Sequence, residues 1–292
     1  WRTFPQFKKQ VIDRSQTRVL AFLNIVGAGM RGGAYEQDVN DMDPKLAANM
    51  ATANKASIVG FKVAHFEAAQ WTPVDNAVEA GKLTGLPVMI DFGGDDRHAP
   101  LSIRDLFFKH LRPGDIYTHT FTELTRRDPI VDLHTRTLKS FVPEAQKKGI
   151  FFDVGFGGAS FDFRQAIPAL KSGFYPNSIS TDLHTGSMNS AMKSMLNIMS
   201  IFLAMGMPLP DVINAATWNP ANEILHPELG HISAGAIADL AILNLRNGKF
   251  GFWDREGFKL KGKHRLECEM TIRAGTIVYD LNGIAEPEFI KK

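Results

Sequence analysis

Side chains that can bind metal ions or move protons stand at or near the ends of several apolar runs in this sequence. They are Lys62, Asp91, His119, Asp182 and His184. Lys62 lies inside the run "IVGFKVAH" at residues 58–65, where an unpaired charge would be costly to bury. Its ammonium must therefore reach solvent from the strand or be chemically altered.

The same residues suit metal chemistry if the runs are parallel strands. In barrels and open α/β sheets, functional groups gather at the carboxyl ends of the strands. Oxygen and nitrogen atoms that meet there suit hard or borderline cations. A lysine can join such a set when its amine is deprotonated or carboxylated to a carbamate, which can bridge two metal ions. We therefore interpret four residues as candidate metal ligands: Lys62, Asp91, His119 and Asp182.

Each candidate also has a purely structural interpretation. Lys62 could extend to solvent, and His119 in "YTHTF" could be a hydrogen-bonded core histidine. Asp91 in "IDFGG" could instead be a turn residue ahead of the glycines. Asp182 in "STDLH" has fewer alternatives, because an acidic side chain that ends an apolar strand must be paired, hydrogen-bonded or metal-bound.

The remaining histidines divide by their distance from the expected mouth of the sheet. His65 and His184 lie close enough to it to contact a substrate. Three others are expected in solvated loops or helix ends: His98, His134 and His226.

Glycines 27, 29 and 32 form G-x-G-x-x-G after an apolar run, in the order of a dinucleotide-binding turn. That turn should open a helix, but residues 34–44 are polar and loop-like, and no acidic residue stands where a ribose would need it. We interpret these glycines as a flexible loop over the mouth. A nucleotide-binding oxidoreductase is therefore the weakest alternative function.

The elements that must position these residues alternate between strand and helix patterns. The predicted strands are residues 18–26, 56–65, 86–94, 114–121, 150–158 and 177–184. The predicted helices are residues 43–54, 72–85, 101–111, a stretch ending at 149, 162–173, 189–206 and 210–225. The first six strand-helix units predict a parallel sheet covered by helices, two units short of a (β/α)8 barrel.

The pattern of apolar and polar residues changes near residue 229. Residues 265–283 alternate apolar and polar side chains and turn at Ala274 and Gly275, as an antiparallel hairpin with one wet face would. We therefore divide the chain into an α/β part, residues 1–228, and a small β part, residues 229–292.

Composition limits the partners. Of the 292 residues, 44% are hydrophobic and 22% charged, which is ordinary for a globular protein. A net charge of +2 without a basic block predicts no nucleic-acid or membrane partner, and the longest apolar stretch, residues 195–209, is too short to cross a bilayer comfortably. The single cysteine, Cys268, excludes an internal disulfide and makes the cytoplasm the expected location.

Lys62, His119 and Asp182 occur in this order ahead of "LGHISAGAIADLAIL" at residues 229–243, and the sequence thereby resembles the amidohydrolase superfamily. More narrowly, it is similar to the amidohydrolase/deacetylase branch related to dihydroorotases and D-aminoacylases. The matching segments span nearly the whole chain: "SQTRVLAFLNIVG", "IVGFKVAH", "LRPGDIYTHTF", "FFDVGFGGASFDF", "SISTDLHTGSMN" and "TWNPANEI".

The resemblance implies a TIM-barrel metallohydrolase, with barrel strands 3–8 in this chain, followed by a small C-terminal β-sandwich. It implies that Lys62 is a carboxylated lysine bridging the metals, that His119 binds the second metal, and that Asp182 is both a ligand and the proton shuttle. The cofactor would be one or two divalent ions, zinc first, with manganese or iron as alternatives. The implied reaction is hydrolysis of an amide or ester of a small molecule, such as N-acyl deacetylation.

Three departures from the pattern support an alternative, a non-catalytic relative. No H-x-H is present, Asp91 stands where a histidine is usual, and Phe156 in "DVGFG" replaces another. The missing H-x-H, the start at Trp1 and the count of six units lead us to expect that the N-terminal portion of the barrel is lacking. We also expect a homo-oligomer.

Overall fold

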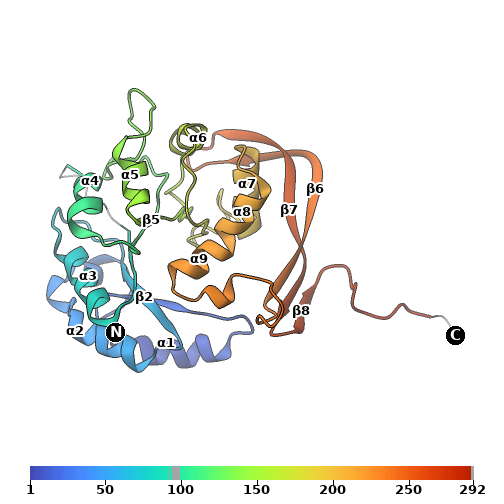
Figure 1. Ribbon diagram of the computed structural model, residues 1–292, viewed down its shortest axis with the longest axis horizontal. Helices are drawn as coiled ribbons and strands as arrows, with labels where there is room; N and C mark the ends of the chain where they lie inside the picture. Colours follow the sequence, from blue (N-terminus) through green and yellow to red (C-terminus); the bar gives the residue numbers. More distant parts are fainter. Residues whose placement is uncertain (92, 94–98, 291–292) are drawn as a thin grey trace.

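The computed structural model describes residues 1–91, 93 and 99–290; His98, predicted to be solvated, lies outside them. A five-stranded parallel sheet in the order β1-β2-β3-β4-β5 forms its centre (Figure 1). The strands are Ala21–Asn24 (β1), Ile58–Val63 (β2), Val88–Ile90 (β3), Ile116–Tyr117 (β4) and Phe151–Phe152 (β5). The parallel α/β sheet predicted from the sequence is confirmed, with each strand shorter than its apolar run.

Strand β2 explains why the runs are so apolar. Ile58, Val59 and Phe61 are almost completely buried, as expected for a strand covered on both faces. Gly60 leaves room for its neighbours, because a Cβ there would lie 2.3 Å from the ring of Phe22. The first strands thus form a rigid platform for the residues that follow them.

The sixth predicted strand, residues 177–184, is an extended segment beside β5. The N–H groups of Val154, Phe156 and Gly157 donate to the carbonyls of Ser178, Ser180 and Thr181 at 2.9–3.2 Å. Regular pairing is confined to a parallel bridge between Asp153 and Ser178. The described sheet is open, with β1 at its edge, so the closed barrel stays a prediction.

Helices follow the strands as predicted, with altered bounds. The α-helices are Phe4–Gln10 (α1), Pro44–Ala53 (α2), Thr72–Thr84 (α3), Ile103–Asp105 (α4), Phe141–Lys147 (α5), Phe163–Lys171 (α6), Met195–Ala204 (α7), Leu209–Ala216 (α8) and Trp218–Glu223 (α9). A π-helical turn, Leu106–His110, continues α4. Short 3-10 turns cover Ile12–Arg14, Gly33–Gln37, Val39–Asp41 and Pro227–Leu229.

Local capping explains where several helices begin and end. The Asp43 carboxylate accepts from the N–H groups of Lys45 and Leu46, which fixes the start of α2. The helix predicted over 189–206 begins only at Met195, because the Ser194 hydroxyl caps it. The helix predicted over 210–225 divides at Thr217, whose φ of −136° is not helical. No helix of the described residues is both long and apolar enough to cross a membrane.

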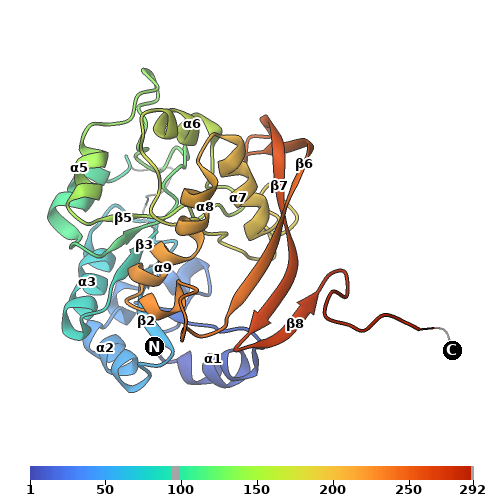
Figure 2. The same ribbon diagram turned by 45° about the vertical axis from the view of Figure 1, so that its right-hand side comes forward.

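A second, antiparallel sheet follows from residue 240, in the order β6-β7-β8. Its strands are Leu240–Trp253 (β6), Lys259–Arg273 (β7) and Thr276–Asp280 (β8). The predicted turn is confirmed, with positive φ at Ala274 and Gly275. The long β6–β7 ribbon runs beside α7, and the segment after β8 extends away from the body (Figures 1 and 2). One sheet is described here, so the complete sandwich, like the division at residue 228, stays a prediction.

Candidate active site

Two of the candidate ligands come into direct contact at the carboxyl ends of β3 and β4. Asp91 follows β3 by one residue and His119 follows β4 by two. The His119 Nε2 atom lies 3.5 Å from Asp91 Oδ2, and both residues are more than nine-tenths buried. Because β3 and β4 are parallel neighbours, the residues that follow them lie close together at the same end of the sheet.

The backbone orients the His119 ring. Its Nδ1 lies 2.5 Å from the carbonyl oxygen of Gly155, which can only accept, so Nδ1–H is the donor. His119 has a φ of +58°, a left-handed conformation that is uncommon for residues other than glycine. The Nε2 atom then faces Asp91 Oδ2, the orientation in which a histidine could present this nitrogen to a metal ion.

Asp91 also pairs with a residue that the sequence analysis missed. Arg127 Nη2 contacts Asp91 Oδ1, while its Nε and Nη1 are buried without a partner among the described residues. Burial alone would raise the pKa of Asp91, but Arg127 and His119 outweigh it and hold that pKa well below its usual value. Asp91 is therefore an ion-paired carboxylate rather than a simple turn residue. In the sequence, the only sign of Arg127 was the pair of arginines in "TRRDP".

Lys62 projects from β2 into the same region and is only partly exposed. Burial lowers the pKa of its ammonium, and the carboxylates of Asp91, Asp153 and Asp182 oppose that shift without cancelling it. Of the three acids that act on Lys62, Asp91 follows β3, Asp153 follows β5 and Asp182 lies in the extended segment beside β5. The lysine thus lies among the candidate ligands, as the convergence of strand ends requires.

Asp182 stands on the open side of the site. It is exposed, has a φ of +46°, and lies against Gly157, where a Cβ would come within 2.5 Å of Asp182 Oδ2. Gly157 is itself held to the neighbouring segment by its N–H bond to Thr181. A solvent-facing carboxylate at the rim can exchange protons with water or substrate.

Beneath the site, Asp153 is the centre of a buried hydrogen-bond network. Its Oδ2 accepts from the hydroxyls of Thr118 at 2.6 Å and Ser180 at 2.7 Å, and its Oδ1 from Ser178 at 2.9 Å. Ser178 also lies 2.9 Å from Glu223 Oε2, a residue of α9 that the sequence analysis did not single out. Burial and the charge of Asp153 raise the pKa of Glu223 to about 8.

Phe156 turns away from this region. It is 1% exposed and its ring stacks on Phe161 with centroids 4.3 Å apart. Phe156 has no atom that could bind a metal ion in place of the usual histidine. Its ring is, in addition, packed into the aromatic core.

His65 and His184 lie in the loops expected for them, where each has a hydrogen-bond partner other than the candidate ligands. His65 Nδ1 pairs with the buried Glu36 Oε2 at 2.7 Å. His184 is exposed, and its Nδ1 accepts from the N–H of Gly186 at 3.1 Å. Their predicted contact with substrate stays a prediction.

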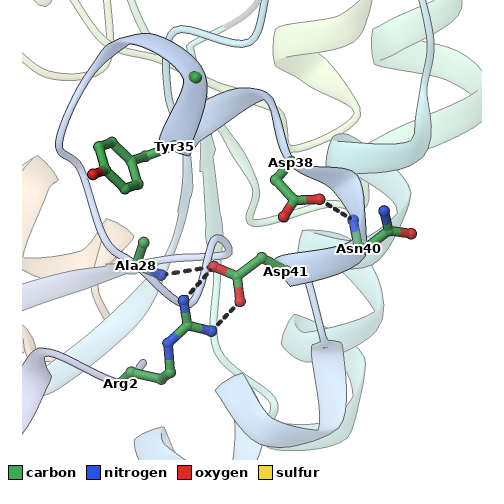
Figure 3. Close-up of a pocket in the computed structure, with 7 residues that line it drawn as sticks. Arg2, Ala28, Tyr35, Asp38, Asn40 and Asp41 are labelled. Atoms are coloured by element: carbon green, nitrogen blue, oxygen red, sulfur yellow. Dashed lines mark hydrogen bonds and ion pairs between the residues drawn. The ribbon is translucent and has the colours of Figure 1, made fainter.

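The glycine-rich loop is held in place by hydrogen bonds from its backbone to acidic side chains. Asp41 accepts from Ala28 N–H at 2.9 Å and pairs with Arg2, at an open pocket of about 450 Å³ (Figure 3). Glu36 accepts from Gly32 N–H at 2.6 Å. The loop predicted to be flexible therefore has anchored ends, because its acidic side chains bind its own backbone.

The donor atoms fit part of a metal site. Within residues 1–91, 93 and 99–290, no three His, Cys, Asp or Glu side chains lie close enough to hold an ion. The pair formed by His119 Nε2 and Asp91 Oδ2 could nevertheless reach one ion, since two bonds of about 2.0–2.2 Å span their separation. Lys62 and Asp182 would have to supply the further donors.

Comparisons with known proteins identify the family and the fold of the chain. Residues 131–278 match the Amidohydrolase family. A protein of Brucella anthropi named deacetylase is 33% identical over 87% of this chain and 63% of its own length. Deacetylase Atu3266 of Agrobacterium fabrum is 31% identical over 87% of this chain and 62% of its own length. The chain thus spans a little under two thirds of these relatives.

Two solved structures share the fold. A dihydroorotase has 28% identity and a TM-score of 0.83, with 95% of this chain and 76% of that one covered. An adenine deaminase has 24% identity and a TM-score of 0.87, with 96% and 75% covered; at that identity it supports the fold alone.

Proposed function

The chain belongs to the amidohydrolase family, and from this premise we propose that its protein is a metal-dependent hydrolase of an amide or ester bond in a small molecule. Removal of an N-acyl group is the favoured reaction, because relatives about 30% identical are named deacetylases. The proposal concerns the whole protein, since the chain spans 63% of the first of these relatives.

The pairing of His119 with Asp91 carries the proposal. Two buried donor atoms that follow different strands lie 3.5 Å apart, and the Gly155 carbonyl orients the His119 ring so that Nε2 faces Asp91. The pair suits a divalent cation, with zinc expected and manganese or iron as alternatives.

The candidate residues of this chain would have different roles in this reaction. Lys62, His119, Asp91 and Asp182 would hold the ion or ions, Lys62 as a carbamate. A bound divalent ion supplies an activated water and polarises the scissile carbonyl. Asp182, exposed at the rim, would accept the proton of that water and return it to the leaving amine. His65 and His184 would border the substrate.

Substitution of Asp182 tests the proposal. Asn tolerates the left-handed backbone at this position, so Asp182→Asn removes the proton acceptor with little change in fold. We expect kcat to fall by about 10²–10⁴-fold in the full-length protein with zinc and a panel of N-acetyl amino acids. Lys62→Ala should lose bound zinc as well as turnover.

Asp13→Asn is the matched control, because Asp13 pairs with Lys8 on the surface and should leave turnover unchanged. Metal-dependent turnover retained in both Asp182→Asn and Lys62→Ala would contradict the proposal.

The second candidate is a non-catalytic relative. Two observations favour it: Arg127 occupies one oxygen of Asp91, and Phe156 is packed into the aromatic core. It predicts no turnover by the full-length protein under any metal condition, with Phe156→His restoring nothing.

A cytoplasmic location and a homo-oligomer remain expectations; sedimentation of the purified protein tests the latter.

A further inference from the structure

Asn24 has a buried donor that the fold leaves unused. Asn24 ends β1 and is 8% exposed. Val26 N–H must donate, and it lies 3.0 Å from Asn24 Oδ1, which identifies the other terminal atom as Nδ2. Among the described residues Nδ2 has no hydrogen-bond partner. An orphaned buried donor costs about 1–3 kcal/mol, so its retention calls for an acceptor that another group supplies.

The neighbour that could carry this acceptor is Lys62. Asn24 pairs with Lys62 in the parallel ladder of β1 and β2, and the Lys62 carbonyl accepts from Ile25 N–H at 2.9 Å. Residues in register on adjacent strands point to the same face and lie about 4.8 Å apart. The Asn24 amide and the Lys62 stem therefore stand side by side at the end of the sheet where Asp91 and His119 meet.

An unmodified lysine gives Asn24 poor complementarity. An ammonium has only donors, so it cannot accept a hydrogen bond from Nδ2. A carbamate on the same stem has two oxygen acceptors. Because the carboxylates of Asp91, Asp153 and Asp182 already act on Lys62, a further negative group there also needs nearby donors.

We propose that Asn24 is a positioning residue that donates a hydrogen bond from Nδ2 to the carbamate of Lys62. This inference rests on the proposed function, in which Lys62 is carboxylated. In that step the lone pair of the neutral amine attacks the carbon of CO2 and an N–C bond forms. One C=O electron pair moves to oxygen, and the nitrogen releases a proton to water. Asn24 would orient the carbamate by holding one of its two oxygens towards β1.

Carbon-13 NMR of the full-length protein with zinc and [13C]bicarbonate tests the inference. The wild type should give a carbamate signal that Lys62→Ala removes. Asn24→Asp keeps the acceptor for Val26 but replaces the donor, and Asn24→Ala removes it without adding charge. In both, the bicarbonate concentration for half-maximal signal should rise at least ten-fold.

Asn197→Asp is the matched control. Asn197 is also buried, but its Nδ2 already donates to the carbonyls of Ala191 and Met192, and it lies on α7. It should lose stability and keep the carbamate signal at temperatures where it stays folded.

The outcomes distinguish a failure of the role proposed for Asn24 from a failure of the proposed function. A wild-type signal that persists unchanged in folded Asn24 variants overturns the role of Asn24 and leaves the proposed function standing; a raised KM in those variants would then assign Asn24 to the substrate. No signal in the wild type removes the carboxylated lysine from the proposed function, and this inference with it. Should neither Asn24 variant fold, the side-chain amide protons of Asn24 in the wild type must shift on addition of bicarbonate, and their failure to do so overturns the inference.

Discussion

Ser178 has one hydroxyl hydrogen but faces two carboxyl groups. Its Oγ lies 2.9 Å from Asp153 Oδ1 and 2.9 Å from Glu223 Oε2, and it can donate to only one of them. The other carboxyl group must therefore carry a proton and donate to Ser178. Glu223 is that group, because burial and the charge of Asp153 raise its pKa to about 8, whereas Asp153 accepts two further hydroxyls.

Protonation of Glu223 predicts a specific dependence of stability on pH. Its unfolded pKa is near 4.5 and its folded pKa about 8. Below pH 4.5 both states hold the proton and the folded state loses nothing. Between pH 4.5 and about 8 the unfolded state releases it first, so the free energy of unfolding falls, by the order of a few kcal/mol. Glu223→Gln should remove this loss.

Thermal unfolding at pH 5 and pH 8 measures the effect. The Tm of Glu223→Gln should exceed that of the wild type by more at pH 8 than at pH 5. Glu144→Gln is the control, because Glu144 is exposed and pairs with Lys148 rather than with a histidine. An equal difference at both pH values would show that Glu223 is ionised in the folded state.

At the scale of elements, the turn after β5 aligns the two sides of the site. The Gly155 carbonyl orients His119, and Gly157 lies against the carboxylate of Asp182. Both glycines have positive φ, +47° and +57°. The short strand and its glycines therefore set the spacing between a buried ligand and the exposed acid.

Gly157→Ala should separate activity from stability. The substitution strains the left-handed backbone by about 1–2 kcal/mol and displaces the flexible Asp182 carboxylate, whose Oδ2 would be 2.5 Å from the new Cβ. We expect kcat to fall at least ten-fold in the full-length protein.

Gly173→Ala provides the comparison. Gly173 has a φ of +82° with open space around it, so the variant has the strain without the displacement. A similar Tm decrease in both variants with loss of kcat in Gly157→Ala alone is the expected result; equal kcat values would mean that Asp182 does not need its present position.

At the scale of the molecule, the antiparallel sheet is fastened to the α/β part at one helix end. In the turn between β6 and β7, Asp254 Oδ2 accepts from Phe163 N–H at 3.0 Å, the first residue of α6, and Oδ1 accepts from Phe258 N–H at 2.9 Å. Arg255 Nε also donates to Asp162 Oδ1 at 2.8 Å. The residue preceding α6 does not cap it with its own side chain, so the distant Asp254 serves instead.

Asp254→Ala should weaken this junction. Asp254 is 1% exposed, and its removal leaves the buried N–H of Phe163 unpaired, which costs about 1–3 kcal/mol. Hydrogen exchange should accelerate at the start of α6 and in the β6–β7 turn. Glu256→Ala, which removes an exposed ion pair in the same turn, should change exchange little. Unchanged exchange in Asp254→Ala would mean that the junction holds by apolar packing alone.

The sequence by itself determined the order of the elements and the choice of candidate site residues. The apolar runs ahead of Lys62, Asp91 and His119 predicted parallel strands because a doubly covered strand must be continuously apolar. Local caps such as Asp43 fixed the start of α2, because their hydrogen bonds join neighbours in the chain.

The tertiary structure alone decided what those side chains contact. Arg127 on Asp91, Glu223 beneath Asp153, and the unused Nδ2 of Asn24 beside Lys62 join residues far apart in the chain. No local pattern encodes such pairs, since burial and hydrogen-bond partners arise only when separate strands and helices are packed together. The same packing turned residues 177–184 from a predicted strand into an extended segment, because Ile179 N–H donates to Ala215 in α8 instead of to a further strand.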